Sequence, residues 1–137
     1  GEYLRKNGNE YGATTGRARR CGWLDLVVVK YAIMVSGIDE IAMTKIDVLD
    51  GLDEIKVCVA YELDGKTIDC MPALNSDFEK VKPIYKTFKG FNGTKGIDTF
   101  DKLPKEAKNY IEEIEKILQT KISIIATGTD RNDTIFR

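Results

Sequence analysis

The segment PKEAKNYIEEIEKIL (Pro104–Leu118), followed closely by ISIIA (Ile122–Ala126), decides the fold class of this chain. In the first part apolar residues recur at helical spacing, lysine and glutamate occupy the opposite face, and Pro104 suits the first position of a helix. The second part is a short apolar run, which predicts a buried strand. Because the apolar stripe of the helix needs a surface to cover, we expect it to pack on a sheet, and the fold class is α/β.

A second helix and a second strand are predicted earlier in the chain. The apolar segment from Trp23 to Val35 contains three consecutive valines, which favour a strand, but its length and the Ser-Gly pair that ends it favour a buried helix. The run from Ile38 to Thr44 predicts a short buried strand. The polar segment from Lys45 to Gly51 follows at the end of this strand, which is where α/β sheets usually carry ligand-binding residues.

The middle of the chain predicts antiparallel strands. Residues 55–63 carry apolar side chains at a period of two and, together with residues 67–70, predict a β-hairpin. Residues 81–88 predict a further strand, limited by Pro83. Residues 1–12 and 89–99 are rich in glycine and predict loops, and no role can be assigned to the second of these loops.

Length and charge narrow the class of protein. With 137 residues and 42% apolar side chains, the chain is one folded unit with a real core. Its 21 basic and 22 acidic side chains nearly cancel, so we expect small-molecule partners rather than nucleic acid or an anionic membrane. No apolar run approaches the roughly 20 residues that a membrane-spanning helix needs.

The cysteine and histidine content further limits the kinds of site that the chain can form. The three cysteines show no C-x-x-C spacing, which argues against a disulfide framework and a zinc site and indicates a reduced, cytoplasmic protein. The chain has no histidine, so the commonest general base and the commonest transition-metal ligand are missing. It begins at Gly1 rather than at a methionine, which hints at a fragment of a longer protein.

The stretch GATTGRARR (Gly12–Arg20) has the composition of an anion-binding loop. Its two glycines allow a tight backbone path, its two threonines offer hydroxyl groups, and its three arginines lie within four positions. The alternative, a solvated basic turn, is equally compatible with this composition.

The tetrapeptide from Thr44 to Asp47 can recognise guanine. One carboxylate accepts two parallel hydrogen bonds, and guanine has two adjacent donors on its Watson–Crick edge, so Asp47 can select guanine over adenine, while Lys45 can lay its methylene stem over the ring. This T-K-x-D resembles the N-K-x-D signature of GTP-binding proteins, in which a second strand-end loop of small residues packs on the base. Ala126-Thr127-Gly128 would be that loop. The alternative is an exposed lysine and aspartate at an ordinary strand end.

Three segments together resemble the adenylosuccinate synthetase family. They are GATTGRARRCGWLD (residues 12–25), TKIDVLDG (44–51) with its extension to Tyr61, and TGTDRNDTI (127–135). The chain is similar to the family almost throughout, over the C-terminal third of the family's usual length, and is identified as a member of it. The resemblance implies a ligase of purine biosynthesis that couples GTP hydrolysis to the joining of IMP and L-aspartate. Phosphate is first transferred to the 6-oxygen of IMP, and the aspartate amine then displaces it to give adenylosuccinate, the committed step towards AMP.

The resemblance also implies two sets of binding residues. The mobile loop that receives the aspartate carboxylates would be Ala13, Thr14, Thr15, Gly16, Arg17, Ala18 and Arg19, of which Arg17 would also contact IMP and Arg19 would also contact GTP. The guanine base would be enclosed by Lys45, Ile46, Asp47, Ala126, Thr127 and Gly128. Many family members have serine in place of Ala126, so a hydroxyl contact to the base is missing here, and Asp47 is expected to maintain guanine selectivity.

The implied fold is part of a P-loop-NTPase-like mixed sheet with flanking helices and a β-hairpin, incomplete without the N-terminal part. The family's glycine-rich phosphate loop, catalytic aspartate and catalytic histidine belong to that part. No catalytic residue is therefore expected in residues 1–137, and Mg²⁺, which phosphoryl transfer requires, would be bound by the missing part. The family is usually a cytoplasmic homodimer, but no residue pattern in this sequence marks an interface.

Three functional hypotheses remain open. Residues 1–137 can be the C-terminal portion of the GTP-dependent ligase, active only together with the missing part. They can instead be a stand-alone guanine-nucleotide-binding module. The third hypothesis is an interaction domain that has kept the fold and lost the chemistry.

Overall fold

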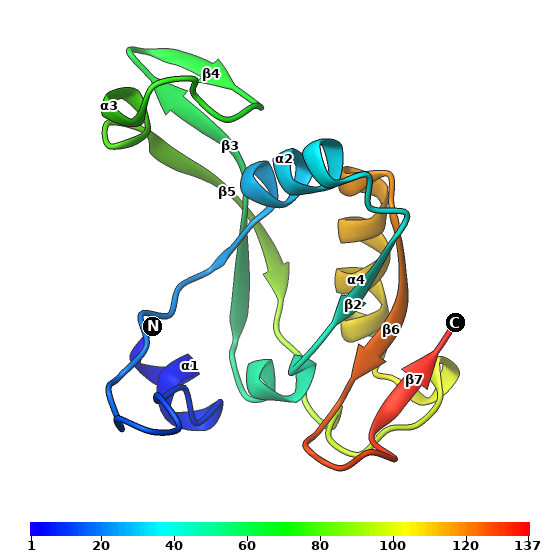
Figure 1. The fold of residues 1–137 in the computed structure, drawn as a ribbon. Coiled ribbons are helices and arrows are strands. Elements are labelled where there is room, and N and C mark those ends of the chain that lie inside the picture. The colour runs from blue at the N-terminus through cyan, green and yellow to red at the C-terminus, as the bar shows by residue number, and fades with distance from the viewer.

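Two small mixed sheets, with helices packed against them, form the structure in a computed structural model that describes residues 1–137 (Figure 1). The first sheet contains β1 (Leu24–Asp25), β3 (Glu54–Leu63), β4 (Lys66–Ile68) and β5 (Lys82–Lys89). The second contains β2 (Glu40–Met43), β6 (Lys121–Ala126) and β7 (Thr134–Phe136), in the order β2-β6-β7. The α-helices are α1 (Glu2–Asn7), α2 (Leu26–Ser36), α3 (Asn75–Phe78) and α4 (Lys105–Leu118), and the 3₁₀ helices are η1 (Ile46–Leu49) and η2 (Phe100–Lys102). The predicted α/β class is confirmed.

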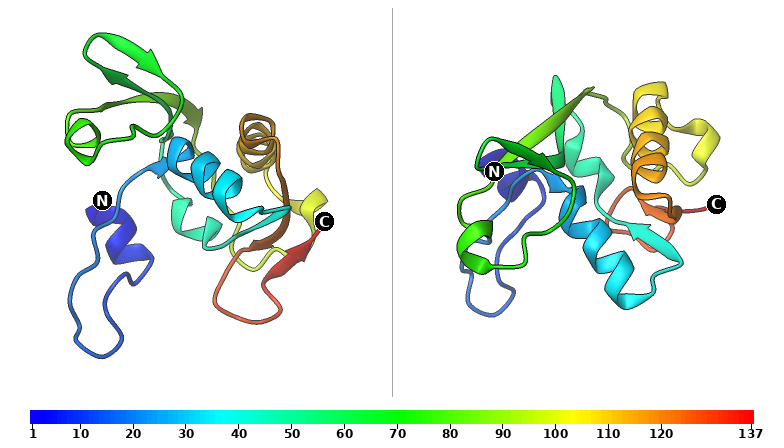
Figure 2. Two further views of the ribbon diagram at one scale, coloured as in Figure 1. Left: turned by 45° about the horizontal axis from the view of Figure 1, so that its top comes forward. Right: turned by 90° about the horizontal axis from the view of Figure 1, so that it is seen from above.

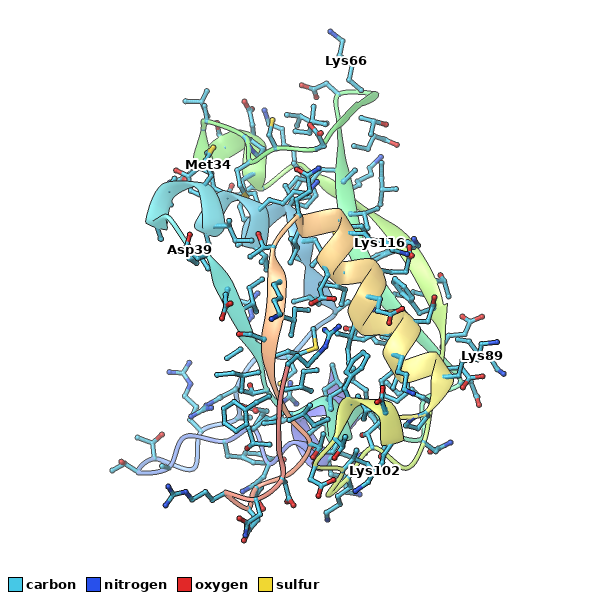
Figure 3. All side chains as sticks on the ribbon, turned by 90° about the vertical axis from the view of Figure 1, so that its right-hand side faces the viewer. Met34, Asp39, Lys66, Lys89, Lys102 and Lys116 are labelled. Carbon is cyan, nitrogen blue, oxygen red and sulfur yellow. The ribbon has the colours of Figure 1, made fainter.

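The main core joins the two sheets, and α4 is its central element. Ile111 and Ile114 of α4 are 0% and 1% exposed, and they belong to one apolar cluster with buried residues of β3, β5, β6 and β7. Tyr110 adds edge-on aromatic packing against Phe88 of β5, with ring centroids 5.3 Å apart. The charged side chains of α4, such as Lys116, lie on the outside (Figure 3). The predicted helix is confirmed, except that Pro104 precedes its first turn as an extended residue and the helix begins at Lys105.

Most predicted strands are confirmed. β3 and β4 form the predicted hairpin, β5 pairs antiparallel with β3, and β6 is the predicted strand after α4. Residues 90–99 contain no strand or helix, as predicted for that loop. The short elements β7, η1, η2 and α3 were not predicted, because three or four residues are too few to show a period.

The helix predicted from Trp23 onwards begins only at Leu26. Residues Leu24 and Asp25 form a two-residue strand, parallel to Val57 and Cys58 of β3. Asp25 then caps the helix, because its Oδ1 accepts the backbone N–H of Val27 at 2.9 Å. The hydroxyl of Tyr61 donates to the other oxygen at 2.5 Å. Burial and this hydrogen bond raise the pKa of Tyr61. Gly37 ends the helix with φ of 62°, in the left-handed conformation that the sequence predicts.

The prediction that α2 and the strand after it are buried is wrong for this chain. In α2 only Leu26 and Val27 are buried, whereas Met34 is 72% exposed and Val35 is 58% exposed (Figure 3). β2 is an edge strand whose side chains are exposed or half-buried. Both elements are apolar in sequence, but residues 1–137 supply no surface that covers their outer side.

The prediction of a loop over residues 1–12 is wrong for residues 2–7, which form α1. This helix has no side-chain cap and buries no residue, so its own sequence gives little reason for it to form. Contacts with distant residues stabilise it: the Tyr3 hydroxyl donates to the carbonyl of Asp50, and Arg5 Nε donates to the carbonyl of Arg19 at 2.8 Å. The N-terminal segment projects from one end of the molecule, away from the C-terminal sheet (Figure 2).

None of the helices is long and apolar enough to cross a membrane.

Candidate functional site

Two loops that were predicted to bind guanine follow neighbouring parallel strands. β2 pairs with β6, and Met43 lies opposite Ile125 at the end of the ladder. Lys45–Asp47 follows directly after β2, and Ala126–Gly128 lies at the end of β6, so both segments lie at the same edge of the sheet, where the two arrows in Figure 1 end. We call these two segments the strand-end loops. This edge is where open α/β sheets bind their ligands.

The first strand-end loop turns sharply at Lys45. This residue has φ of 61° and ψ of 37°, a left-handed conformation that is uncommon outside glycine, and it begins the 3₁₀ helix η1. The side chain of Ile46 is 1% exposed and belongs to the core, so only its backbone is available to a ligand. Asp47 is half-buried, and its carboxylate makes no hydrogen bond or ion pair within the chain. It is free to accept two donors from outside.

The second strand-end loop is held from within. Thr127 is completely buried; its hydroxyl donates to the carbonyl of Ile97 at 2.7 Å, and its N–H donates to the carbonyl of Asp133 at 2.9 Å. A Cβ at Gly128 would come within 2.9 Å of Cγ of Asp133, so a larger residue there would have to displace the Asp133 side chain. Of the three residues in this loop, Ala126 and Gly128 are only half-buried and remain accessible, whereas Thr127 is already fully hydrogen-bonded.

The arginine stretch forms an exposed hairpin. Residues 10–19, the arginine hairpin, are held by backbone hydrogen bonds between Gly12 and Arg17 at 2.9 Å and between Arg19 and Glu10 at 2.9 Å. Gly16 allows the turn, with φ of 63°. Residues 13–20 are all exposed, and Arg17 makes no ion pair. An exposed guanidinium on a short hairpin is well suited to grip a carboxylate or phosphate.

Glu10 joins the arginine hairpin to the first strand-end loop. One of its carboxylate oxygens accepts from Arg19 Nη1 at 3.0 Å, and the other accepts from Lys45 Nζ. Lys45 Nζ also donates to the carbonyl of Gly8 at 2.9 Å. The hydrogen bonds from Lys45 and Arg19, in that order of size, hold the pKa of Glu10 below its ordinary value. Arg19 and Lys45, which the sequence analysis assigned to ligands, thus both bind the Glu10 carboxylate in the structure.

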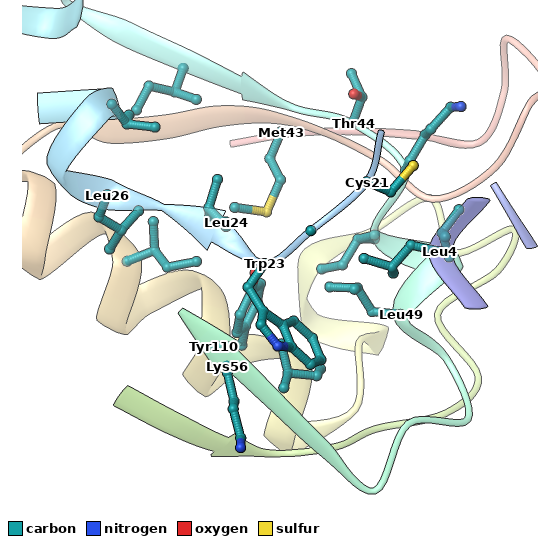
Figure 4. Close-up of a pocket in the computed structure, with 18 of the residues that line it drawn as sticks. Leu4, Cys21, Trp23, Leu24, Leu26, Met43, Thr44, Leu49, Lys56 and Tyr110 are labelled. Atoms are coloured by element: carbon teal, nitrogen blue, oxygen red, sulfur yellow. The ribbon is translucent and has the colours of Figure 1, made fainter. Parts of the chain in front are cut away.

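A cavity of about 560 Å³ lies behind these segments (Figure 4). It is lined by 24 residues, 17 of them apolar, most of which come from the 19–26 segment, β2, η1, β3 and α4. Trp23, Leu24 and Met43 are among its apolar lining residues (Figure 4). The charged residues Glu10, Arg19 and Lys45 also line it. A site for a charged nucleotide needs convergent polar groups, and this lining has few of them. The cavity is therefore better suited to apolar side chains of a protein surface.

Metal-binding side chains do not gather anywhere in residues 1–137. No group of three or more Asp, Glu, Cys or His side chains lies close enough to hold an ion.

The mixed sheets, the polar loops at one edge and the neighbouring arginine hairpin define an α/β protein with the ligand-binding layout of open sheets. A family model described as adenylosuccinate synthetase matches residues 1–135, and the chain belongs to this family. It is 53% identical to the adenylosuccinate synthetase of Wolinella succinogenes over 137 residues, which cover 100% of this chain and 32% of that protein. It is also 53% identical to the enzyme of Aquifex aeolicus, over 99% of this chain and 32% of that protein.

A solved structure agrees with this assignment. The chain superposes with a TM-score of 0.94 on the structure of fully ligated adenylosuccinate synthetase from Plasmodium falciparum, at 42% identity. The superposition covers 100% of this chain and 34% of that chain. The chain thus spans about a third of the length of the relatives it matches.

Sequence reasoning missed three residues that organise this region. Glu10 ties the arginine hairpin to Lys45, Asp50 binds the loop after β5, and Asp133 closes the second strand-end loop. Asp50 and Asp133 lie in the segments TKIDVLDG and TGTDRNDTI, so the sequence showed where they are but not which groups they bind. Glu10 carries no local signal, because its partner Lys45 lies 35 positions away.

The ion pairs of Glu10 with Lys45 and Arg19 predict how the stability of the fold and the titration of Glu10 depend on pH. Its folded-state pKa is lower than its unfolded value, so its contribution to stability is fully present above about pH 4.3 and is lost as the pH falls through the lower, folded-state pKa. We expect Lys45→Met to raise the midpoint of the Glu10 titration, measured by NMR of the labelled carboxyl carbon. Arg19→Met should raise it less. A midpoint that does not move in Lys45→Met would contradict the observed bridge.

Proposed function

We propose that residues 1–137 form the C-terminal portion of an adenylosuccinate synthetase, which joins IMP and L-aspartate with hydrolysis of GTP. One observation carries this proposal: in a chain that matches the family over residues 1–135, β2 and β6 are parallel neighbours, and they bring both predicted guanine-binding loops to one sheet edge. In this proposal the chain supplies binding and orientation, and no catalytic residue. GTP is a co-substrate of the reaction.

Guanine is proposed to lie between the strand-end loops. Asp47 is the residue best placed to select it, because its carboxylate is half-buried and has no partner within the chain. Lys45 can cover the ring with its methylene stem, although its ammonium group is held by Glu10. Ala126 and Gly128 would contact the opposite side of the base, while Thr127 and Ile46 would contribute through packing and backbone only.

The arginine hairpin, with Ala13, Thr14, Thr15, Gly16 and Ala18 as its tip, is proposed to receive the two carboxylates of L-aspartate. Arg17 is free of internal ion pairs and would contact aspartate and IMP. Arg19 would contact aspartate and GTP, for which it must share or release Glu10. An arginine fork binds a carboxylate through two parallel hydrogen bonds, and this fixes the orientation of the substrate.

The remaining two-thirds of the enzyme is proposed to cover the apolar cavity and the outer face of α2. The chain spans 32% of the length of its relatives, so in this proposal a large surface of the complete enzyme would lie outside residues 1–137. The outer edge of β2 has no strand partner, and Tyr31, Met34 and Val35 form an exposed apolar face on α2. A helix that is apolar nearly all round is normally buried on all sides. This part would also bind Mg²⁺, complete a P-loop-NTPase-like sheet and supply the phosphate-binding groups.

The complete enzyme is proposed to be a cytoplasmic homodimer, as is usual in the family. No residue of this chain can be assigned to a dimer interface.

Replacement of the hairpin arginines tests the aspartate assignment. In the complete enzyme, Arg17→Ala or Arg19→Ala should lower kcat/KM for L-aspartate by the equivalent of about 2–5 kcal/mol, because each fork engages a carboxylate away from water. The measurement is steady-state kinetics with L-aspartate varied at saturating GTP and IMP. Arg20→Ala is the matched control, since this exposed neighbour has no assigned ligand. A loss below about 1 kcal/mol in both variants would favour a solvated basic turn instead.

Calorimetry with GDP separates the ligase portion from a stand-alone guanine-nucleotide-binding module. We expect weak or undetectable binding to residues 1–137 alone, because the strand-end loops offer contacts to the base but none to the phosphates. The complete enzyme is the positive control. Tight binding of GDP by the isolated chain would favour the module and contradict the ligase-portion proposal.

A further inference from the structure

We propose that the segment Gly90–Thr99 positions the two strand-end loops relative to each other, and that Thr94 is the residue that holds them together. This proposal rests on the proposed function, because it concerns the same guanine site. The segment connects β5 with η2 and passes the sheet edge at which β2 and β6 end (Figure 1). Its composition gave no indication of a role.

Thr94 holds the turn that carries Asp47. Thr94 is completely buried, and both oxygens of the Asp50 carboxylate accept from it: the backbone N–H donates to one at 2.9 Å and the hydroxyl donates to the other at 2.9 Å. Asp50 in turn donates its N–H to the carbonyl of Asp47 at 3.2 Å and so closes the 3₁₀ turn. The conformation around Asp47 therefore depends on Thr94.

The same segment holds the second strand-end loop a few residues further on. Ile97 donates its N–H to the carbonyl of Thr94 at 3.2 Å, which makes this part of the segment a closed turn. Gly96 donates its N–H to the carbonyl of Thr127 at 3.2 Å, and the Thr127 hydroxyl donates to the carbonyl of Ile97 at 2.7 Å. A continuous series of hydrogen bonds thus connects Asp50 with Thr127.

Burial of the threonines in this series of hydrogen bonds favours one relative position of the two strand-end loops. Thr94 and Thr127 are the only two buried polar residues of the chain, and both belong to this series. A buried hydroxyl that loses its partner carries the full cost of desolvation, so arrangements of the loops that leave the Thr94 or Thr127 hydroxyl unpaired are disfavoured. The two strand-end loops are therefore held at a fixed separation before any nucleotide arrives.

The segment is anchored at its start as well. Phe91 is 3% exposed and packs on Tyr110 of α4, with ring centroids 5.9 Å apart. Gly90 donates its N–H to the carbonyl of Asp53 at 2.8 Å and passes so close to the chain that a Cβ would come within 2.6 Å of the carbonyl carbon of Leu52. The start of the segment is therefore fixed on the core, which in turn fixes the segment relative to the strand-end loops.

Thr94 acts by positioning, since its two donors are taken by Asp50 and none is left for a ligand. The test is Thr94→Val in the complete enzyme, which keeps the shape and the backbone N–H but removes the hydroxyl. We expect the KM for GTP to rise on the order of tenfold, with kcat and the KM values for IMP and L-aspartate unchanged. Thr94→Ser should restore the KM for GTP. Thr99→Val is the matched control, because the exposed Thr99 hydroxyl contacts only Asp98.

Three outcomes would overturn the proposal. A purely structural role would lower the melting temperature and the amount of active enzyme, with all three KM values unchanged. Asp47→Ala, measured in parallel, shows whether the positioning role of Thr94 or the guanine assignment of Asp47 is wrong. If it raises the KM for GTP and Thr94→Val does not, the positioning role alone is wrong; if neither variant changes this KM, the guanine assignment itself is wrong.

Discussion

The parallel pairing of β2 with β6 is the constraint on which the rest of this structure depends. Parallel strands must both run towards one edge, so the residues after Met43 and after Ile125 come together although they are separated by some eighty positions in the sequence. α4 makes this pairing possible, because it packs its apolar face against β6 and returns the chain to the start of the sheet. Binding residues can then lie at the edge without contributing to the core.

Two sets of polar contacts turn this edge into a defined site. Glu10 brings the arginine hairpin to Lys45, and the Gly90–Thr99 segment connects Asp50 with Thr127. The first set is exposed and can rearrange when anions bind, since exposed ion pairs contribute little to stability. The second is anchored on two completely buried threonines, Thr94 and Thr127, whose hydroxyls would lose stability if left unpaired. Under the proposed function, the exposed hairpin would receive substrate carboxylates beside the base site between the strand-end loops, and both would orient substrates for the reaction.

Periodicity predicted α4 and the β3–β4 hairpin, because their apolar side chains recur on the face that packs in the core, and a short apolar run predicted β6. The apolar composition of α2 predicted burial wrongly, because residues 1–137 cover only Leu26 and Val27 of this helix. α1 was missed because it depends on Tyr3 and Arg5 reaching distant carbonyls. Within the site, Asp47 was predictable from its place after a strand. Glu10 and Thr94 were not, since their partners lie 35 and 44 positions away.

The central claim is that Asp47 reads guanine at this edge. The most direct test is Asp47→Asn in the complete enzyme, with GTP and xanthosine triphosphate compared as substrates. Asparagine can donate to the 2-oxo group of xanthine but cannot accept both guanine donors, so the ratio of kcat/KM for the two nucleotides should shift towards xanthosine triphosphate by at least about a hundredfold. An unchanged preference for GTP would contradict the claim, and the guanine site could then not be assigned to this edge of the sheet.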